Sequence, residues 1–208
     1  MSLERLKTHN SDAETDTLKR PSSKPVRELT PSAPLYSLDT LWFQVGGTIC
    51  NLWCTHCFIS CSPENHKFGF MPRETVQKYL QESKGIGVKE YYFTGGEPFM
   101  NRDMLGILQD TLAIGPATVL ANGILIQERV ARQLEKIAEN SIFSLELRVS
   151  IDGFTAEEND RIRGEGSFRK AMLGVKTWSS TVSCLLLRWR KPGRIGRQKI
   201  SCMDSKRS

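Results

Sequence analysis

The chain has 208 residues, of which 39% are hydrophobic and 25% charged, a composition typical of a globular protein with one sizeable core. Its formal net charge of +6 would suit a nucleic-acid partner. However, residues 179–208 carry eight Lys and Arg against one acidic residue, Asp204, so this segment alone holds +7 and leaves the remainder at −1. We therefore expect no nucleic-acid partner for the folded part.

The cysteines and the apolar runs indicate the cellular compartment. No stretch approaches the roughly 18 apolar residues of a membrane span, and residues 1–36 lack the apolar core of a signal peptide. We therefore expect a cytoplasmic protein with no membrane partner. Four of the six cysteines fall between positions 50 and 61, and without a secretion signal such a cluster favours metal binding over a disulfide framework.

The chain divides into three segments by composition. Residues 1–36 are rich in Ser, Thr, Pro, Lys and Glu, which predicts a disordered N-terminal arm. Across residues 37–178 the hydrophobic period switches repeatedly between two and 3.6, with Gly, Pro or Asn at the switches, which predicts alternating strands and helices. Residues 179–187 could start a fifth strand, but the basic run that follows has no apolar period. We expect residues 179–208 to form a basic irregular tail and to complete no fifth unit.

Four β/α units are expected in series. The predicted strands are 41–45, 91–94, 117–121 and 145–150. The predicted helices are 72–84, a helix with Asn101 as N-cap, a helix carrying Val130, Leu134 and Ile137, and a helix carrying Phe168, Ala171, Met172 and Val175. This order predicts an α/β fold with a parallel sheet, outer helices and an active face at the strand C-termini.

A cysteine triplet follows the first predicted strand. Cys50, Cys54 and Cys57 have the spacing C-x3-C-x2-C, so a tight loop could aim three thiolates at one point. Three thiolates on a four-iron cluster leave one iron open to an outside ligand. A zinc site is the alternative, but zinc sites usually join two cysteine pairs, and only Cys184 and Cys202 lie outside the cysteine-rich segment.

The triplet after a first strand resembles the radical S-adenosylmethionine (radical SAM) superfamily, and the resemblance continues over residues 38–178. It implies a partial (β/α) barrel with about four of the family's six units. It also implies a 4Fe–4S cluster on Cys50, Cys54 and Cys57, with S-adenosylmethionine chelated to the open iron. In such an enzyme an electron from the reduced cluster cleaves S-adenosylmethionine to a 5′-deoxyadenosyl radical, which takes a hydrogen atom from the substrate.

The resemblance further implies partners. An electron donor such as a flavodoxin or a ferredoxin would reduce the cluster. The substrate is unknown, and a peptide is one candidate because His56 and Phe58, on either side of Cys57, resemble the subset of the family that modifies peptides or builds peptide-derived cofactors.

Gly95, Gly96 and Glu97 end the second predicted strand and match the family's glycine-glycine-glutamate stretch. There the missing side chains would let backbone oxygens reach the methionine ammonium. Gly96→Val is therefore expected to weaken S-adenosylmethionine binding while leaving the cluster in place.

The resemblance assigns further cofactor contacts at the ends of later strands and beside the cluster. These residues are Phe58, Asn122, Ser150, Asp152 and Arg163. Ser150 would contact the ribose or the carboxylate, and Arg163 would pair with the carboxylate through a bidentate fork. A turn residue and a helix-side cap are equally compatible with Asn122 and Asp152, and a solvated surface arginine with Arg163.

The sequence leaves open two rival hypotheses for the function and the roles of three cysteines. The chain could be a truncated or frame-shifted relative that binds cofactor or a partner without turnover, because no fifth unit is expected. A zinc-binding module is the weaker rival. Cys61 is expected to be a free or supporting thiol, and the sequence gives no role to Cys184 or Cys202.

Overall fold

The computed structural model describes residues 34, 36–181, 184–191 and 194–201. The predicted N-terminal arm lies almost entirely outside these residues. The chain divides into two units between Leu35 and Tyr36. No helix in the described ranges is long and apolar enough to cross a membrane.

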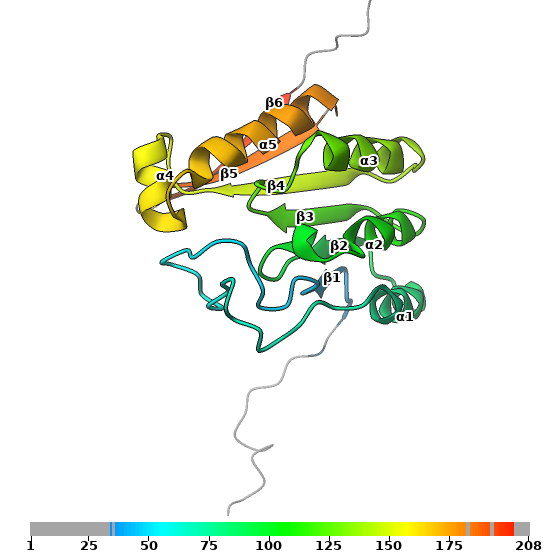
Figure 1. Ribbon diagram of the computed structural model, residues 1–208. Coiled ribbons are helices and arrows are strands. Elements are labelled where there is room, and N and C mark those ends of the chain that lie inside the picture. The colour runs from blue at the N-terminus through cyan, green and yellow to red at the C-terminus, as the bar shows by residue number, and fades with distance from the viewer. Residues whose placement is uncertain (1–33, 35, 182–183, 192–193, 202–208) are drawn as a thin grey trace, which may run out of the picture. The chain divides into compact units, whose positions relative to one another are not determined.

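The second unit is a sheet with helices packed against it (Figure 1). Its elements are β1 (Thr40–Phe43), α1 (Arg73–Lys84), β2 (Glu90–Phe93), the 3-10 turn η2 (Pro98–Met100), α2 (Met104–Thr111), β3 (Ala117–Ala121), α3 (Glu128–Glu139), β4 (Leu145–Ile151), α4 (Ala156–Arg163), α5 (Ser167–Thr181), β5 (Cys184–Lys191) and β6 (Arg194–Ser201). The described strands follow the order β1-β2-β3-β4-β5-β6. Strands β1 to β5 are parallel, and β6 is antiparallel to β5.

Alternation along the strands separates two faces of the sheet. Leu145, Leu147 and Val149 are buried in β4, while the residues between them are half-buried, as expected where one face of a sheet packs against helices. Phe93 and Val119 on the neighbouring strands are fully buried in the same core. Burial of each such side chain stabilises the fold by about 1.5–3 kcal/mol.

The other face of the sheet carries an aromatic and charged row. Trp42 and Tyr92 stack with ring centroids 4.5 Å apart, and the Arg148 guanidinium lies 5.2 Å from the Tyr92 centroid. Arg148 Nε also pairs with Glu146 Oε1 at 2.6 Å. This face is therefore ordered by cross-strand pairs.

The predicted α/β fold, with four parallel β/α units and outer helices, is confirmed. Strand β3 has the predicted bounds and α1 begins one residue later than expected. Asn101 is not the N-cap of α2, because Asp103 holds that position. Instead, Asn101 Nδ2 donates to Val45 O at 3.1 Å and to Met71 O at 2.9 Å. Helix α4 was not anticipated as a separate element.

The expected irregular tail after residue 178 is corrected in part. The predicted start of a fifth strand corresponds to β5, which pairs with β4, but the basic run continues that strand and then forms β6. The physical reason is visible in the order Leu187, Arg188, Trp189, Arg190, where apolar and basic residues alternate with the period of a strand. Cys184 falls in β5, and Cys202 lies outside the described residues.

The packing of α5 on the turn after β3 gives a testable prediction. A Cβ added at Gly174 would lie 2.0 Å from Gly123 O, so Gly174→Ala should force α5 away from the turn. The expected loss is about 1–3 kcal/mol of unfolding free energy, although Ala in place of Gly normally stabilises a helix by about 1 kcal/mol. Denaturant titration measures the difference.

A matched control lies in another helix. A Cβ at Gly106 in α2 would meet only the end of the flexible Arg73 side chain, so Gly106→Ala should be neutral or stabilising. Equal stability of the two variants would contradict the proposed close contact at Gly174.

Candidate cofactor site

The cysteines lie in a long connection between β1 and α1, here called the cysteine loop (residues 46–70). Its two ends are held together, because Met71 N donates to Val45 O at 3.1 Å. The Asn101 side-chain amide donates to Val45 O and to Met71 O. The loop is therefore closed at its base by a side chain from the segment that follows β2.

The start of the cysteine loop lies against the end of β2. Gly46 N donates to Thr94 O at 3.1 Å, Gly96 N to Gly47 O at 3.0 Å, and Glu97 N to Ile49 O at 3.0 Å. These bonds extend the parallel pairing of β1 with β2 beyond the strands themselves. They place Cys50 directly after the paired segment.

Glycine is required where these two segments meet. A Cβ on Gly96 would lie 1.9 Å from Ile49 O, and one on Gly95, whose φ is +132°, would lie 2.6 Å from Gly46 N. The expectation that Gly96→Val would leave the cluster untouched therefore needs correction. A side chain at Gly96 would displace the backbone that leads into Cys50.

Thr48 orders the rest of the loop. Its Oγ1 donates to Asn65 O at 3.0 Å and accepts from Phe68 N at 3.1 Å. Cys50 N also donates to Ser62 O at 3.2 Å. The returning half of the loop is thus fixed to the half that carries the triplet.

The predicted site residues come together around one cavity of about 450 Å³ at the C-terminal ends of the parallel strands. It is lined by the following predicted residues: Cys50, Cys54, Cys57, Phe58, Gly95, Gly96, Asn122, Ser150, Asp152 and Arg163. Phe58 is 94% exposed, so it lies at the cavity's rim. The lining residues that the sequence analysis missed include Gln44 and Leu120, and their places at strand ends are the signal that could have found them.

Each cysteine of the triplet has a different donor nearby. Asn122 Nδ2 lies 3.9 Å from Cys50 Sγ, and Arg163 Nη1 lies 4.0 Å from Cys54 Sγ. The backbone N–H of Cys61 donates to Cys57 Sγ at 3.2 Å. Such donors favour the thiolate form and tune the potential of a bound cluster.

Burial opposes the thiolates. It raises the pKa of Cys50 to about 11 and also raises the pKa of Cys54, and it raises the pKa of Cys61 to about 12. Without a cation these thiols keep their protons at neutral pH. A bound metal centre supplies the positive charge that removes them.

The three cysteines of the triplet line one cavity. In a four-iron cluster held by three thiolates, each cysteine binds a different iron and one iron is left open to an outside ligand. Within the described residues, no group of three His, Cys, Asp or Glu side chains forms a site for one metal ion.

Glu97 has a different place from the other predicted residues. Its side chain is fully buried, with Oε1 accepting from Phe99 N at 3.1 Å and Oε2 accepting from Asn122 N at 2.8 Å. Burial raises the pKa of Glu97 to about 7. The carboxylate therefore ties the end of β2 to the end of β3 and is not part of the cavity lining.

Asn122 combines the two roles that its sequence position allowed. Its Oδ1 accepts from Ile124 N at 3.0 Å, which is a turn contact. Its Nδ2 donates to Asn51 Oδ1 at 2.6 Å and lines the cavity beside Cys50. Ser150 lines the same cavity from β4.

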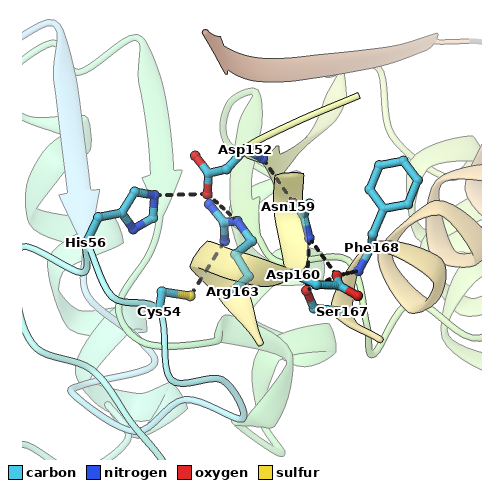
Figure 2. Close-up of polar contacts among 8 residues, drawn as sticks. All are labelled: Cys54, His56, Asp152, Asn159, Asp160, Arg163, Ser167 and Phe168. Carbon is cyan, nitrogen blue, oxygen red and sulfur yellow. Dashed lines mark hydrogen bonds and ion pairs between the residues drawn. The ribbon is translucent and has the colours of Figure 1, made fainter. Parts of the chain in front are cut away.

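Asp152 and Arg163 form a largely buried ion pair that the more exposed His56 also contacts, and Figure 2 shows the three residues beside Cys54. Asp152 Oδ2 lies 2.6 Å from Arg163 Nε and 2.9 Å from His56 Nε2. The Arg163 side chain is 13% exposed, so it is not a solvated surface arginine. His56 thus contacts Asp152 from the cysteine loop, on the side of the loop that carries Cys54 and Cys57.

Comparisons with known proteins agree with this geometry. The family model described as the radical SAM superfamily matches residues 45–185. An AdoMet-dependent heme synthase of Oleidesulfovibrio alaskensis is 30% identical over 129 residues, which cover 61% of this chain and 32% of that protein. A GTP 3′,8-cyclase of Cronobacter sakazakii is 26% identical over 136 residues, covering 61% of this chain and 38% of that protein.

Solved structures share the fold. Streptococcus suis SuiB bound to S-adenosylmethionine has a TM-score of 0.58 at 19% identity, covering 73% of this chain and 33% of that chain. The enzyme anSMEcpe with bound AdoMet has a TM-score of 0.54 at 20% identity, covering 69% of this chain and 41% of that chain. This chain thus spans about a third of the length of the curated relatives it matches. The family model covers well over half of the chain, and the chain belongs to the radical SAM superfamily, whose members are enzymes that bind a 4Fe–4S cluster and S-adenosylmethionine.

Proposed function

We propose that this chain holds a 4Fe–4S cluster through Cys50, Cys54 and Cys57, binds S-adenosylmethionine beside it, and starts radical chemistry on a substrate. The observation that carries the proposal is the single cavity lined by the three thiols and by polar groups from the ends of β2, β3 and β4. When bound, the reduced cluster supplies the electron that cleaves S-adenosylmethionine to a 5′-deoxyadenosyl radical for hydrogen abstraction.

The protein's own groups would divide the binding of S-adenosylmethionine among them. The Gly95 and Gly96 peptide groups line the cavity, so their backbone can approach the methionine amino group. Arg163 has five N–H donors, forms an ion pair with Asp152 and lines the cavity, so its guanidinium would bind the carboxylate. The Ser150 hydroxyl, at the cavity wall, would bind the ribose or the carboxylate.

Apolar residues complete the cavity. Leu52, Ile59, Leu120 and Ile151 line it between the polar groups. They exclude water from the reacting atoms, which strengthens every electrostatic contact inside and limits side reactions of a radical.

The electron donor and the substrate belong to the same proposal. A flavodoxin or a ferredoxin is the proposed donor. A peptide is the substrate class that we propose to test first, because His56 and Phe58 flank Cys57 as in the peptide-modifying subset, and SuiB has also been solved with its precursor peptide SuiA.

The first prediction concerns the cluster and its chemistry. Protein reconstituted anaerobically with iron and sulfide should be brown and bind about four irons. Adding dithionite and S-adenosylmethionine should yield 5′-deoxyadenosine, measured by chromatography, and omitting dithionite should abolish it. Stoichiometric zinc without sulfide would reject the proposal in favour of the zinc module.

A second prediction separates the four cysteines of the loop. Cys50→Ala, Cys54→Ala and Cys57→Ala should each lose the intact cluster, because each removes one of three ligands. Cys61→Ala should keep it, because the contact from residue 61 to Cys57 is made by the backbone N–H, which alanine retains. Iron and sulfide analysis with electron paramagnetic resonance measures the outcome, and equal loss in all four variants would make Cys61 a ligand.

A third prediction tests the glycine contact. Gly96→Ala should lower the unfolding free energy by about 3 kcal/mol and impair cluster assembly, because its Cβ would collide with Ile49 O. The matched control is Gly69→Ala in the same loop, where a Cβ meets no atom within 4 Å. Gly96→Ala protein with normal stability and a full cluster would show that the side-chain-free contact is not required.

A further inference from the structure

We propose that Asp152 is a positioning residue: its carboxylate joins His56 of the cysteine loop to Arg163 of α4, and so holds the Arg163 guanidinium beside Cys54 and at the cavity wall. This inference rests on the proposed function. It assigns to Asp152 a role different from the direct cofactor contact that the sequence suggested.

The carboxylate is placed by the fold before it meets its partners. Asp152 directly follows β4, and its backbone N–H donates to Asn159 Oδ1 at 3.0 Å. Asn159 is buried in α4 and also donates from Nδ2 to Ser167 Oγ at 2.9 Å. Asp152 is therefore fixed between the end of the sheet and two helices.

The position of α4 is itself secured at both ends. Thr155 Oγ1 accepts from Glu158 N at 3.2 Å at the helix start. Near the helix end, Asp160 accepts from Gly166 N at 2.7 Å and from Phe168 N at 2.8 Å, which anchors the start of α5 (Figure 2). The backbone of Arg163 is thus held without Asp152, and what Asp152 adds is the direction of the side chain.

The ion pair keeps the guanidinium beside Cys54. Nε of Arg163 lies 2.6 Å from Asp152 Oδ2 as an ion pair, although neither atom makes a hydrogen bond within the described residues, and Nη1 lies 4.0 Å from Cys54 Sγ. The attraction between the two buried charges therefore holds the planar guanidinium in this place. Without Asp152 the long arginine side chain could turn away from Cys54.

The same carboxylate oxygen also reaches the cysteine loop. His56 Nε2 lies 2.9 Å from Asp152 Oδ2, and the adjacent Thr55 N donates to Ile162 O at 2.9 Å. The segment between Cys54 and Cys57 is therefore attached to Asp152 by one side-chain contact and to α4 by one backbone hydrogen bond. The Asp152 side chain is only 5% exposed and the His56 side chain 33%, so the carboxylate end of this contact is buried and the imidazole end reaches solvent.

The first test uses the reduction potential of the cluster without S-adenosylmethionine. Arg163→Gln should lower the potential, because it removes a positive charge beside a cluster sulfur. If Asp152 positions Arg163, Asp152→Ala should also lower the reduction potential. The Arg163 charge, 4.0 Å from Cys54 Sγ, acts on the cluster more strongly than the Asp152 charge behind it, so displacing the arginine outweighs removing the carboxylate. A rise in potential in Asp152→Ala would show that Asp152 acts only through its own charge and would overturn the proposal.

The second test is a double-mutant cycle on S-adenosylmethionine affinity, measured by calorimetry. Asp152→Ala and Arg163→Gln should each weaken binding about tenfold, which is about 1.4 kcal/mol, and the double variant should be no weaker than Arg163→Gln alone. Additive losses would mean that Asp152 contacts the cofactor independently. Arg161→Gln is the matched control, since Arg161 is an exposed arginine on the same helix with its side chain 73% exposed.

A third arm needs no cluster and separates this inference from the proposed function. Hydrogen exchange of the metal-free protein should be faster at the Thr55 amide in Asp152→Ala than in wild type or Arg161→Gln. If Asp152→Ala does not fold, Asp152→Asn is measured in its place. Unchanged exchange at Thr55 would overturn the proposed link between Asp152 and the cysteine loop. Faster exchange in the variant, together with failure of the wild type to assemble a cluster, would reject the proposed function and leave this link standing.

Discussion

The contact between two stretches of side-chain-free backbone, at Gly46 and Gly47 and at Gly95 and Gly96, is the constraint on which the site depends. It consists of backbone hydrogen bonds that extend the β1–β2 pairing past the ends of both strands. Because these two segments approach so closely that no Cβ fits on Gly96, Cys50 lies directly above the sheet. The remaining cysteines then need only a short loop to reach the same cavity.

The close approach of these segments requires the carboxyl group of Glu97 to be buried, which is energetically unfavourable. Its carboxyl follows the glycine pair into the core, where burial raises its pKa from an ordinary 4.5 to about 7. The folded state therefore holds this proton more tightly than the unfolded chain, so the stability contributed here is full below about pH 4.5 and is lost as pH rises through about 7. Two backbone N–H groups, from Phe99 and Asn122, offset part of the cost. The carboxyl satisfies the donors that the ends of β2 and β3 leave inside the protein.

Features encoded locally could be predicted from the sequence, and features created by distant contacts could not. The alternation of Leu145, Leu147 and Val149 predicted β4, and the cysteine spacing with the strand-ending glycines predicted the residues around the cavity. By contrast, Asn101 looked like a helix cap because its bond to Val45 spans 56 residues. The inward turn of Glu97 likewise depends on Asn122, 25 residues away. Helix α4 is too short and too polar to show a clear hydrophobic period. The basic residues of β5 were interpreted as an irregular tail, although they alternate with apolar residues as in a strand.

The three cysteines of the triplet are chemically unequal, and this inequality follows from which element faces each of them. Cys50 meets the neutral amide of Asn122 directly after β3, Cys57 meets a backbone N–H from its own loop, and Cys54 meets a guanidinium from α4. Among the described residues that line the cavity, Arg163 is the one permanent cation. A reduced cluster gains negative charge, and a fixed cation next to one thiolate stabilises that charge more than mobile water would. Since Asp152 compensates the same cation from behind, the protein can keep Arg163 buried in the apolar wall without leaving it unpaired. The site thus keeps a positive group facing the place where electron density would arrive, and the contact with His56 ties that group to the loop that carries the thiols.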